Sequence, residues 1–331
     1  MVRSPADTGR QPAAARDVAA PARDHTRRHP QVVGHACLAI DRAGGAPTRR
    51  QLDEALALGL DRVEIDVCSS ADGHLVVRHD KVLADGRFVA DVDLDGLRRD
   101  DPELLTLDDV SEHLDGRIPM LLDIKMAHAA KALGPWLLGR RDPGQFALCT
   151  ENLPWLLHLR FAAPRVARWP SFPDIGDHSR HHVQRVVAGL WRSHASLGGL
   201  RRGLSDVHHV ARHLRHRPEE SLARLAALPW RGLPLDITGL CRDLGAEGVC
   251  VQKWLISGLL VEEAHRAGLH VNTWTINDPA IAQTVAAAGV DSITTDRVAA
   301  LRLALGLGSP PRLPAAGGGP RLRVAGRSAQ S

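Results

Sequence analysis

Aromatic side chains are scarce in this sequence: they make up 3% of its 331 residues, and tyrosine is absent. Branched aliphatic residues and alanine must therefore fill any large core. No run reaches the apolar length that a membrane-spanning helix needs, and the residues before Pro30 lack the apolar segment of a signal peptide. We therefore expect a soluble protein.

The sequence also lacks the signals of two other classes of protein. Its cysteines number five, an odd count without paired spacing, which predicts reduced thiols and a cytoplasmic location. No Cys/His finger spacing, basic helix with heptads or aromatic-studded basic strand is present, so we expect no nucleic-acid partner. The formal charge of +4 suits an anionic substrate or a membrane surface without deciding between them.

Short apolar runs alternate with helical patterns in the middle of the chain. We predict one domain over residues 31–305, with disordered tails at 1–30 and 306–331, where Ala, Arg, Pro and Gly prevail without periodicity. The predicted strands of the domain are Gln31–Leu38, Arg62–Cys68, Met120–Ile124, Phe146–Thr150, Arg165–Arg168, Gly248–Gln252, His270–Ile276 and Asp291–Thr294, with a hairpin strand at His74–His79. The clearest predicted helices are Thr48–Leu58, Leu107–Leu114, Ala127–Leu138, Pro279–Ala288 and Val298–Leu305.

This order predicts an α/β fold, a (β/α)8 TIM-type barrel. Strands that alternate with helices form βαβ units and a parallel sheet, and eight strands close a barrel. The alternative is an open doubly wound sheet, but no G-x-G-x-x-G follows the first strand. Residues 177–231 are too long for one connection, and we expect a helical insertion there.

The insertion at 177–231 has two interpretations. It contains eight of the 18 histidines and many arginines. These residues favour an outer helical layer with a solvated basic face. Basic amphipathic helices with Trp and Leu also suit lipid headgroups, so peripheral membrane contact through this segment stays open.

Two carboxylates share one face of a predicted strand in Val63-Glu64-Ile65-Asp66-Val67. Successive side chains of a strand alternate between its faces, so Glu64 and Asp66 point together. Inside a barrel the two would repel each other and be costly to bury unless a cation neutralised them. Hard oxygen ligands favour Mg²⁺ or Ca²⁺. The pattern therefore predicts a site for one divalent cation.

Other polar residues end neighbouring strands. Asp123 and Lys125 share a face of the next predicted strand. Asp123 could be a third ligand of the cation, and Lys125 could supply a positive charge to a phosphate oxygen. His35 and His79 also lie near strand ends. The carboxyl ends of barrel strands are where barrel enzymes carry out their chemistry.

The order of these motifs resembles the glycerophosphodiester phosphodiesterase family. A histidine is followed by E-x-D about thirty residues on, then by His79-Asp80 and by an acid-x-Lys strand. The far end is similar through Ala264–Gly268, Val271–Asn277 and Ala288–Asp296.

The resemblance implies a role for each matched residue. Glu64, Asp66 and Asp123 would hold the cation, His35 and His79 would be the general acid and base, Lys125 would bind phosphate, and Trp274 would line the site. The implied activity is metal-dependent cleavage of a glycerophosphodiester into glycerol phosphate and an alcohol.

Three positions depart from the family pattern. Ala36 stands where an arginine usually follows the first histidine, Ala46-Pro47-Thr48-Arg49 replaces Pro-Glu-Asn-Thr, and Asp123 stands where glutamate is common. Strand alternation points Arg78 away from the face of His79, so it is no simple substitute.

The departures leave two alternatives. The segment around His35 also resembles spider-type phospholipase D toxins, which implies a lipid phosphodiester substrate and a cyclic phosphate product. The other alternative is an inactive barrel that binds phosphate compounds or membranes.

Overall fold

The computed structural model describes residues 29–39, 41–172 and 237–308. The predicted insertion at 177–231 and nearly all of both predicted tails lie outside the described residues, so these predictions stay untested. Within the described part of the chain, no helix combines the length and the apolar character that crossing a bilayer requires.

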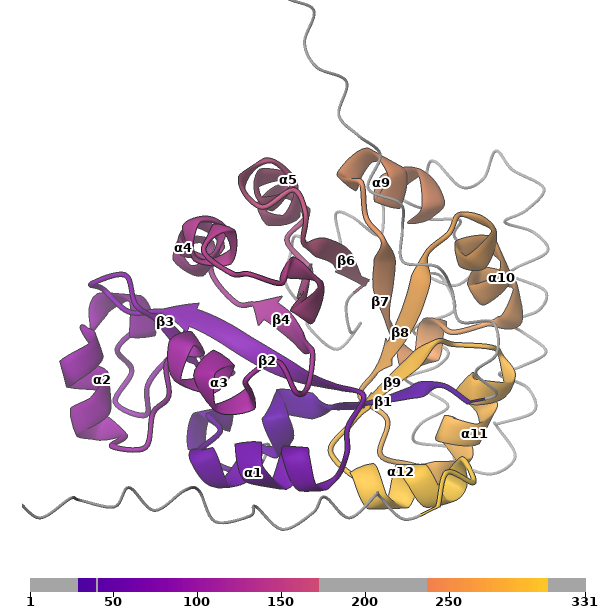
Figure 1. The fold of residues 1–331 in the computed structure, drawn as a ribbon, viewed down its shortest axis with the longest axis horizontal. Helices are drawn as coiled ribbons and strands as arrows, with labels where there is room; N and C mark the ends of the chain where they lie inside the picture. The colour runs from indigo at the N-terminus through magenta and orange to yellow at the C-terminus, as the bar shows by residue number, and fades with distance from the viewer. Residues whose placement is uncertain (1–28, 40, 173–236, 309–331) are drawn as a thin grey trace, which may run out of the picture.

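The strands form a closed barrel (Figure 1). Their bounds are β1 Gln31–Gly34, β2 Arg62–Ser69, β3 Leu75–Val77, β4 Met120–Ile124, β5 Phe146–Thr150, β6 Ala167–Phe172, β7 Gly248–Gln252, β8 His270–Trp274 and β9 Ser292–Thr295. The order is β1-β9-β8-β7-β6-β5-β4-β2-β3, and a parallel pairing of β1 with β2 closes the ring. Only β3 pairs antiparallel among the described strands, as the predicted hairpin, and it lies outside the ring. The predicted (β/α)8 barrel is confirmed.

Helices surround the strands in Figure 1. Their bounds are α1 Arg49–Ala57, α2 Leu94–Asp100, α3 Leu107–Leu114, α4 Ala127–Leu138, α5 Leu153–Ala162, α9 Ile237–Leu244, α10 Gly258–Arg266, α11 Pro279–Ala287 and α12 Val298–Ala304. Side-chain caps begin several of them: Thr106 accepts a hydrogen bond from Asp109 N at 3.1 Å, and Asp278 accepts one from Ala280 N at 2.8 Å. Such caps satisfy amide groups that the first turn of a helix leaves open.

Strand alternation divides the interior into two layers. On β2, Val63, Ile65 and Val67 are fully buried in the large core between strands and helices. A smaller apolar cluster, with Cys149, Trp169 and Cys250 among its members, packs inside the ring. The polar residues of the same strands share this inner face, so the barrel itself aims them at one another.

Six of the nine strand predictions differ from the structure at one end or both, and two of them differ most. The first strand ends at Gly34 and not at Leu38, because His35–Leu38 forms a tight 3₁₀ turn. Strand β6 runs over Ala167–Phe172 and not Arg165–Arg168, and it continues through Pro170, a residue that lacks an amide hydrogen and usually argues against a strand interior.

Candidate active site

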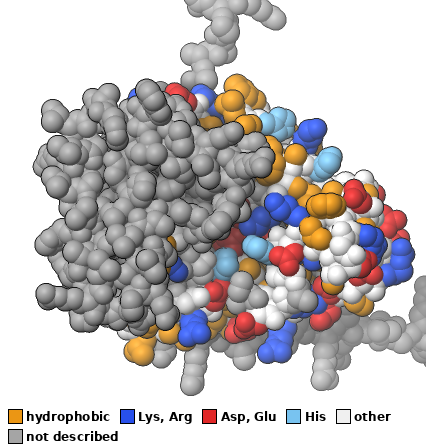
Figure 2. All heavy atoms as spheres, turned by 180° about the vertical axis from the view of Figure 1, so that it is seen from behind, with side chains coloured by type: hydrophobic (Ala, Val, Ile, Leu, Met, Phe, Trp, Pro, Cys, Tyr) orange, Lys and Arg blue, Asp and Glu red, His pale blue; other side chains and the backbone are white. Residues whose placement is uncertain are grey.

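A cavity of about 710 Å³ opens at the carboxyl ends of the barrel strands. Six of the seven predicted site residues line it: His35, Glu64, His79, Asp123, Lys125 and Trp274. The seventh, Asp66, is 2% exposed and lies against Lys125. On the face in Figure 2, histidine, basic and acidic side chains gather near the centre of the described surface. The structure therefore brings the predicted set together at one end of the barrel.

The three acids converge because β2 and β4 are paired in register. Asp66 lies opposite Asp123 in this pairing, and Glu64 precedes Asp66 on the same face. Oxygen atoms of the three carboxylates lie within 4.8 Å of one another. Neighbouring parallel strands thus supply a compact cluster from two segments that are distant in sequence.

Two oxygens of this cluster lack a hydrogen-bond partner among the described residues. Glu64 Oε2 accepts from Ala36 N at 2.7 Å and Asp66 Oδ1 lies 2.8 Å from Lys125 Nζ, but Glu64 Oε1 and Asp66 Oδ2 are buried without such a contact. Burial, and then the charge of Asp66, raises the pKa of Glu64 to about 8. A buried carboxylate oxygen without a partner is costly, and a hard divalent cation is the ligand that this all-oxygen set fits.

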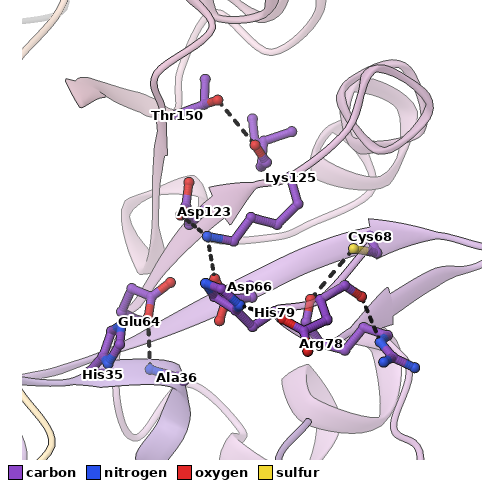
Figure 3. Close-up of polar contacts among 12 residues, drawn as sticks. His35, Ala36, Glu64, Asp66, Cys68, Arg78, His79, Asp123, Lys125 and Thr150 are labelled. Carbon is purple, nitrogen blue, oxygen red and sulfur yellow. Dashed lines mark hydrogen bonds and ion pairs between the residues drawn. The ribbon is translucent and has the colours of Figure 1, made fainter. Parts of the chain in front are cut away.

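Lys125 bridges two of the acids (Figure 3). Its Nζ lies 2.5 Å from Asp123 Oδ2 as well as 2.8 Å from Asp66 Oδ1. Burial alone would lower the pKa of Lys125, but the charges of Asp123 and Asp66 hold it well above its usual value. The ammonium therefore stays charged and is held by carboxylates.

His35 is the first residue after β1 and is fixed by an acid from the other end of the chain. Its Nδ1 lies 2.6 Å from Asp296 Oδ1, across 261 residues of sequence. Burial would lower the pKa of His35, but the hydrogen bond with Asp296, together with the charge of Glu64, raises it to about 9. Asn277 donates to Asp296 Oδ2 at 2.6 Å and so holds the carboxylate in place. His35 is therefore charged near neutral pH, with Nε2 as its remaining ring nitrogen.

His79 follows β3 and is about half exposed at the cavity. Its Nδ1 lies 3.0 Å from Asp80 Oδ1, and its backbone amide donates to Gly44 O at 2.9 Å. The neighbouring Gly45 has φ +59, and a Cβ there would lie 2.7 Å from His79 Cβ, so this position needs glycine. The segment Gly44–Gly45 thus packs against His79 and holds its backbone in place.

The turn after β1 carries backbone strain. Ala36, Cys37 and Leu38 have φ values of 44°, 46° and 68°, a left-handed conformation that costs about 1–2 kcal/mol for each residue other than glycine. This turn aims the Ala36 amide at Glu64 Oε2. Strain of this kind persists where the surrounding structure fixes a functional geometry.

Comparison with known families identifies the chain. The sequence model of the glycerophosphoryl diester phosphodiesterase family matches residues 46–141 and 219–300, together more than half of the chain. The protein belongs to this family. It is therefore a phosphoric diester hydrolase of the glycerophosphodiester phosphodiesterase class, as the resemblance in its motifs implied. Among curated proteins, none matches the chain.

Solved structures of glycerophosphodiester phosphodiesterases share the fold. A phosphodiesterase of Oleispira antarctica, solved with the product sn-glycerol-3-phosphate, is 19% identical with a TM-score of 0.56, over 84% of this chain and 97% of its own. The enzyme of Thermotoga maritima is 18% identical with a TM-score of 0.54, over 85% and 100%. That of Parabacteroides distasonis is 17% identical with a TM-score of 0.58, over 84% and 98%. At these identities the likeness establishes the barrel fold alone.

Sequence reasoning missed several residues of this phosphodiesterase's cavity. Sequence reasoning placed Asp296 only at the end of a matched motif; it does not line the cavity, but it is the partner of His35. The segment after β5 lines the cavity with Thr150, Glu151, Asn152 and Trp155. Their position just past a strand end was the available signal, since the carboxyl ends of all barrel strands meet at this rim.

Proposed function

We propose that this family member hydrolyses glycerophosphodiesters to glycerol phosphate and an alcohol, using one divalent cation and two histidines. One observation carries the proposal. Two buried carboxylate oxygens, Glu64 Oε1 and Asp66 Oδ2, lack partners in the described part of the chain, at the same end of the barrel as the charged His35. Buried carboxylate oxygens to which no described residue donates favour a bound ligand at this place.

Glu64, Asp66 and Asp123 would hold the cation. The fit is supported by the all-oxygen donor set and by the two partnerless oxygens, and Mg²⁺ or Ca²⁺ suits such ligands best. A bound cation would offset the negative charge that makes a phosphodiester repel nucleophiles. The same charge would counter the burial and the repulsion that raise the pKa of Glu64.

His35 is proposed as the general acid. With its pKa raised to about 9, it carries a proton at neutral pH, and Asp296 on Nδ1 leaves the proton at Nε2 free to move. Donation from Nε2 to the leaving alkoxide would prevent a high-energy anion from forming. Asp296 would hold the ring orientation and stabilise the imidazolium.

His79 is proposed as the general base. It lines the same cavity from the segment after β3 and is about half exposed, so its ring can reach incoming water. Removing a proton from that water would create the nucleophile. If a hydroxyl of the substrate attacked instead, the product would be a cyclic phosphate.

The glycerol side of the substrate would lie against Trp274. Its ring lines the cavity, and its Nε1 is buried without a hydrogen-bond acceptor among the described residues. The structure of the Oleispira antarctica phosphodiesterase with sn-glycerol-3-phosphate supports a small glycerol phosphate product here too. We also propose a cytoplasmic location, which the five free and buried cysteines support.

Turnover with and without cation tests this proposal. Protein treated with EDTA would be given glycerophosphocholine, glycerophosphoethanolamine or lysophosphatidylcholine, before and after Mg²⁺ or Ca²⁺ is returned. We expect glycerol 3-phosphate from the first two substrates only when cation is present, and ³¹P NMR would distinguish it from a cyclic phosphate. Wild-type turnover no higher than that of Glu64→Gln with every cation would overturn the proposal.

A further inference from the structure

Lys125, which the family resemblance predicts to bind phosphate, already forms ion pairs with two acids. Its ammonium lies 2.8 Å from Asp66 Oδ1 and 2.5 Å from Asp123 Oδ2. Both acids belong to the cluster that would hold the cation. A lysine held between two carboxylates acts first as their counter-ion, keeping them ionised and close together.

Arg78 does not replace it at the cavity. The side chain is only 9% exposed, and its Nε donates to Asp80 O at 2.8 Å. It does not line the cavity, as strand alternation predicted. Position 36, next to His35, carries only the methyl group of alanine.

Lys81 is the other lysine of the cavity wall. It is exposed and lies two residues after His79, so it stands at the opening of the same cavity. Within the described ranges its ammonium makes no hydrogen bond or ion pair. Its backbone is nevertheless fixed, because Val89 N donates to Lys81 O at 2.9 Å and a bridge between Val82 and Phe88 closes the loop beyond it.

We propose that Lys81 binds the phosphate group of the substrate at the opening of the cavity, while Lys125 positions the acids. A phosphodiester has two non-bridging oxygens that share one negative charge. One oxygen would face the acid cluster and its cation. The other would face outward toward Lys81, a cavity-lining cation with which no described residue pairs. An exposed lysine at an opening also raises the local concentration of anionic substrate. The inference rests on the proposed function.

Substitution of Lys81 by a neutral chain of similar length tests the inference. We expect Lys81→Met to raise KM for glycerophosphoethanolamine about tenfold, the effect of one charge-assisted contact, with kcat within about threefold of wild type. Lys81→Arg should restore most of the loss, because it restores the charge. Lys131→Met is the matched control, since Lys131 is exposed on α4 and does not line this cavity.

The dependence of KM on salt concentration distinguishes phosphate binding by Lys81 from a purely structural role, which would not change it. Wild-type KM should rise with NaCl, and the KM of Lys81→Met should rise less steeply, because one of the screened positive charges is gone. An unchanged KM and an unchanged salt dependence in Lys81→Met, with Lys131→Met alike, would overturn the inference.

Binding separates this inference from the proposed function. Calorimetry with sn-glycerol 3-phosphate and Mg²⁺ needs no turnover, and Lys81→Met should weaken the affinity about tenfold. A wild-type protein that hydrolyses nothing but binds this compound through Lys81 would sink the proposed function and keep the inference. An active wild type whose affinity does not depend on Lys81 would do the reverse.

Discussion

The buried acid Glu64 at the carboxyl end of the barrel differs from the acids at the amino end in how its oxygens are satisfied. At the amino end, Glu247 uses both oxygens: Oε2 accepts from Arg168 N and Oε1 accepts from Arg168 Nη2, each at 2.8 Å. Asp291 Oδ2 accepts from Val271 N at 2.7 Å and lies 3.0 Å from His265 Nε2. At the carboxyl end, the buried Glu64 keeps one oxygen to which no described residue donates.

This difference distinguishes acids that stabilise the fold from acids that are suited to bind a ligand. The amino-end acids tie strand ends to neighbouring segments through contacts that the protein itself supplies. At the carboxyl end, Glu64, Asp66 and Asp123 are brought together against their mutual repulsion. Lys125 offsets this repulsion for Asp66 and Asp123, but no described residue donates to Glu64 Oε1 or Asp66 Oδ2. Whether each carboxylate oxygen has a hydrogen-bond or ion-pair partner therefore indicates function better here than burial of the acid alone.

The largest expected effect contrasts Glu64→Gln with Glu247→Gln. Glu64→Gln should lower kcat/KM about 10²–10³-fold, the usual scale for loss of an electrostatic group at a reacting centre, without loss of stability in EDTA. Glu247→Gln should leave kcat/KM within about threefold and lower the free energy of unfolding by about 1–3 kcal/mol, because Arg168 loses its charged partner. Steady-state kinetics and urea unfolding measure both. Equal losses of activity in the two variants would contradict the distinction between Glu64 as a functional acid and Glu247 as a structural one.

Each end also has a His–Asp pair, and their expected roles differ. Asp296→Asn should reduce kcat about 10–100-fold and move the alkaline limb of the pH–rate profile to lower pH, because the pKa of His35 falls from about 9 without that carboxylate. Asp291→Asn, which changes the partner of His265, is the control and should leave the profile in place. A shift of similar size in both variants would contradict the assignment of His35 as general acid.

Cation binding should change how stability depends on pH. The raised pKa of His35 stabilises the fold below pH 6.5, and this contribution disappears as pH passes about 9. The pKa of Glu64, raised from 4.5 to about 8, lets it keep its proton in the folded state, so stability falls further as pH rises through that range. Protein in EDTA should therefore have a lower Tm near pH 9 than near pH 5.

Added Mg²⁺ or Ca²⁺ should raise the Tm most at the alkaline end, since it binds ionised carboxylates. Calorimetric scans at several pH values, with and without EDTA, would test this. A cation effect that is largest near pH 5 would argue against a carboxylate site.

The smallest effects concern the backbone at the two ends. At the amino end, Gly268 takes φ +79, and a Cβ at this position would meet nothing within 4 Å, so Gly268→Ala should cost about 1–2 kcal/mol through strain alone. At the carboxyl end, Ala36 has φ 44, and Ala36→Gly relieves strain while making the unfolded chain more flexible. The net change for Ala36→Gly should stay within about 1 kcal/mol. Denaturant unfolding of both variants would measure the difference.

The fold was largely predictable because short strand-forming runs alternate with helical patterns along the chain. Met120–Ile124, Phe146–Thr150 and Gly248–Gln252 agree with the structure at both ends. The turn at His35–Leu38 was missed because its left-handed residues include no glycine or asparagine, the usual signal for that conformation. Tertiary contacts, above all the bond from Ala36 N to Glu64, impose it.

The site was predictable as a set of residues but not as a set of contacts. Alternation along β2 placed Glu64 and Asp66 on one face, and the structure has them there. The engagement of Lys125 depends on the register between β2 and β4, which no local pattern encodes. The bond from Asp296 to His35 joins the two ends of the barrel sequence, so only the closure of the ring reveals it.

The most direct test of the central claim is the number of divalent cations that each chain binds. Protein freed of metal with EDTA would be titrated with Mn²⁺, followed by electron paramagnetic resonance, and Mg²⁺ and Ca²⁺ would then compete for the site. The account predicts one site per chain, lost in Glu64→Gln and Asp66→Asn and kept in Glu247→Gln. A site that survives both carboxyl-end substitutions, or no binding at all, would contradict it.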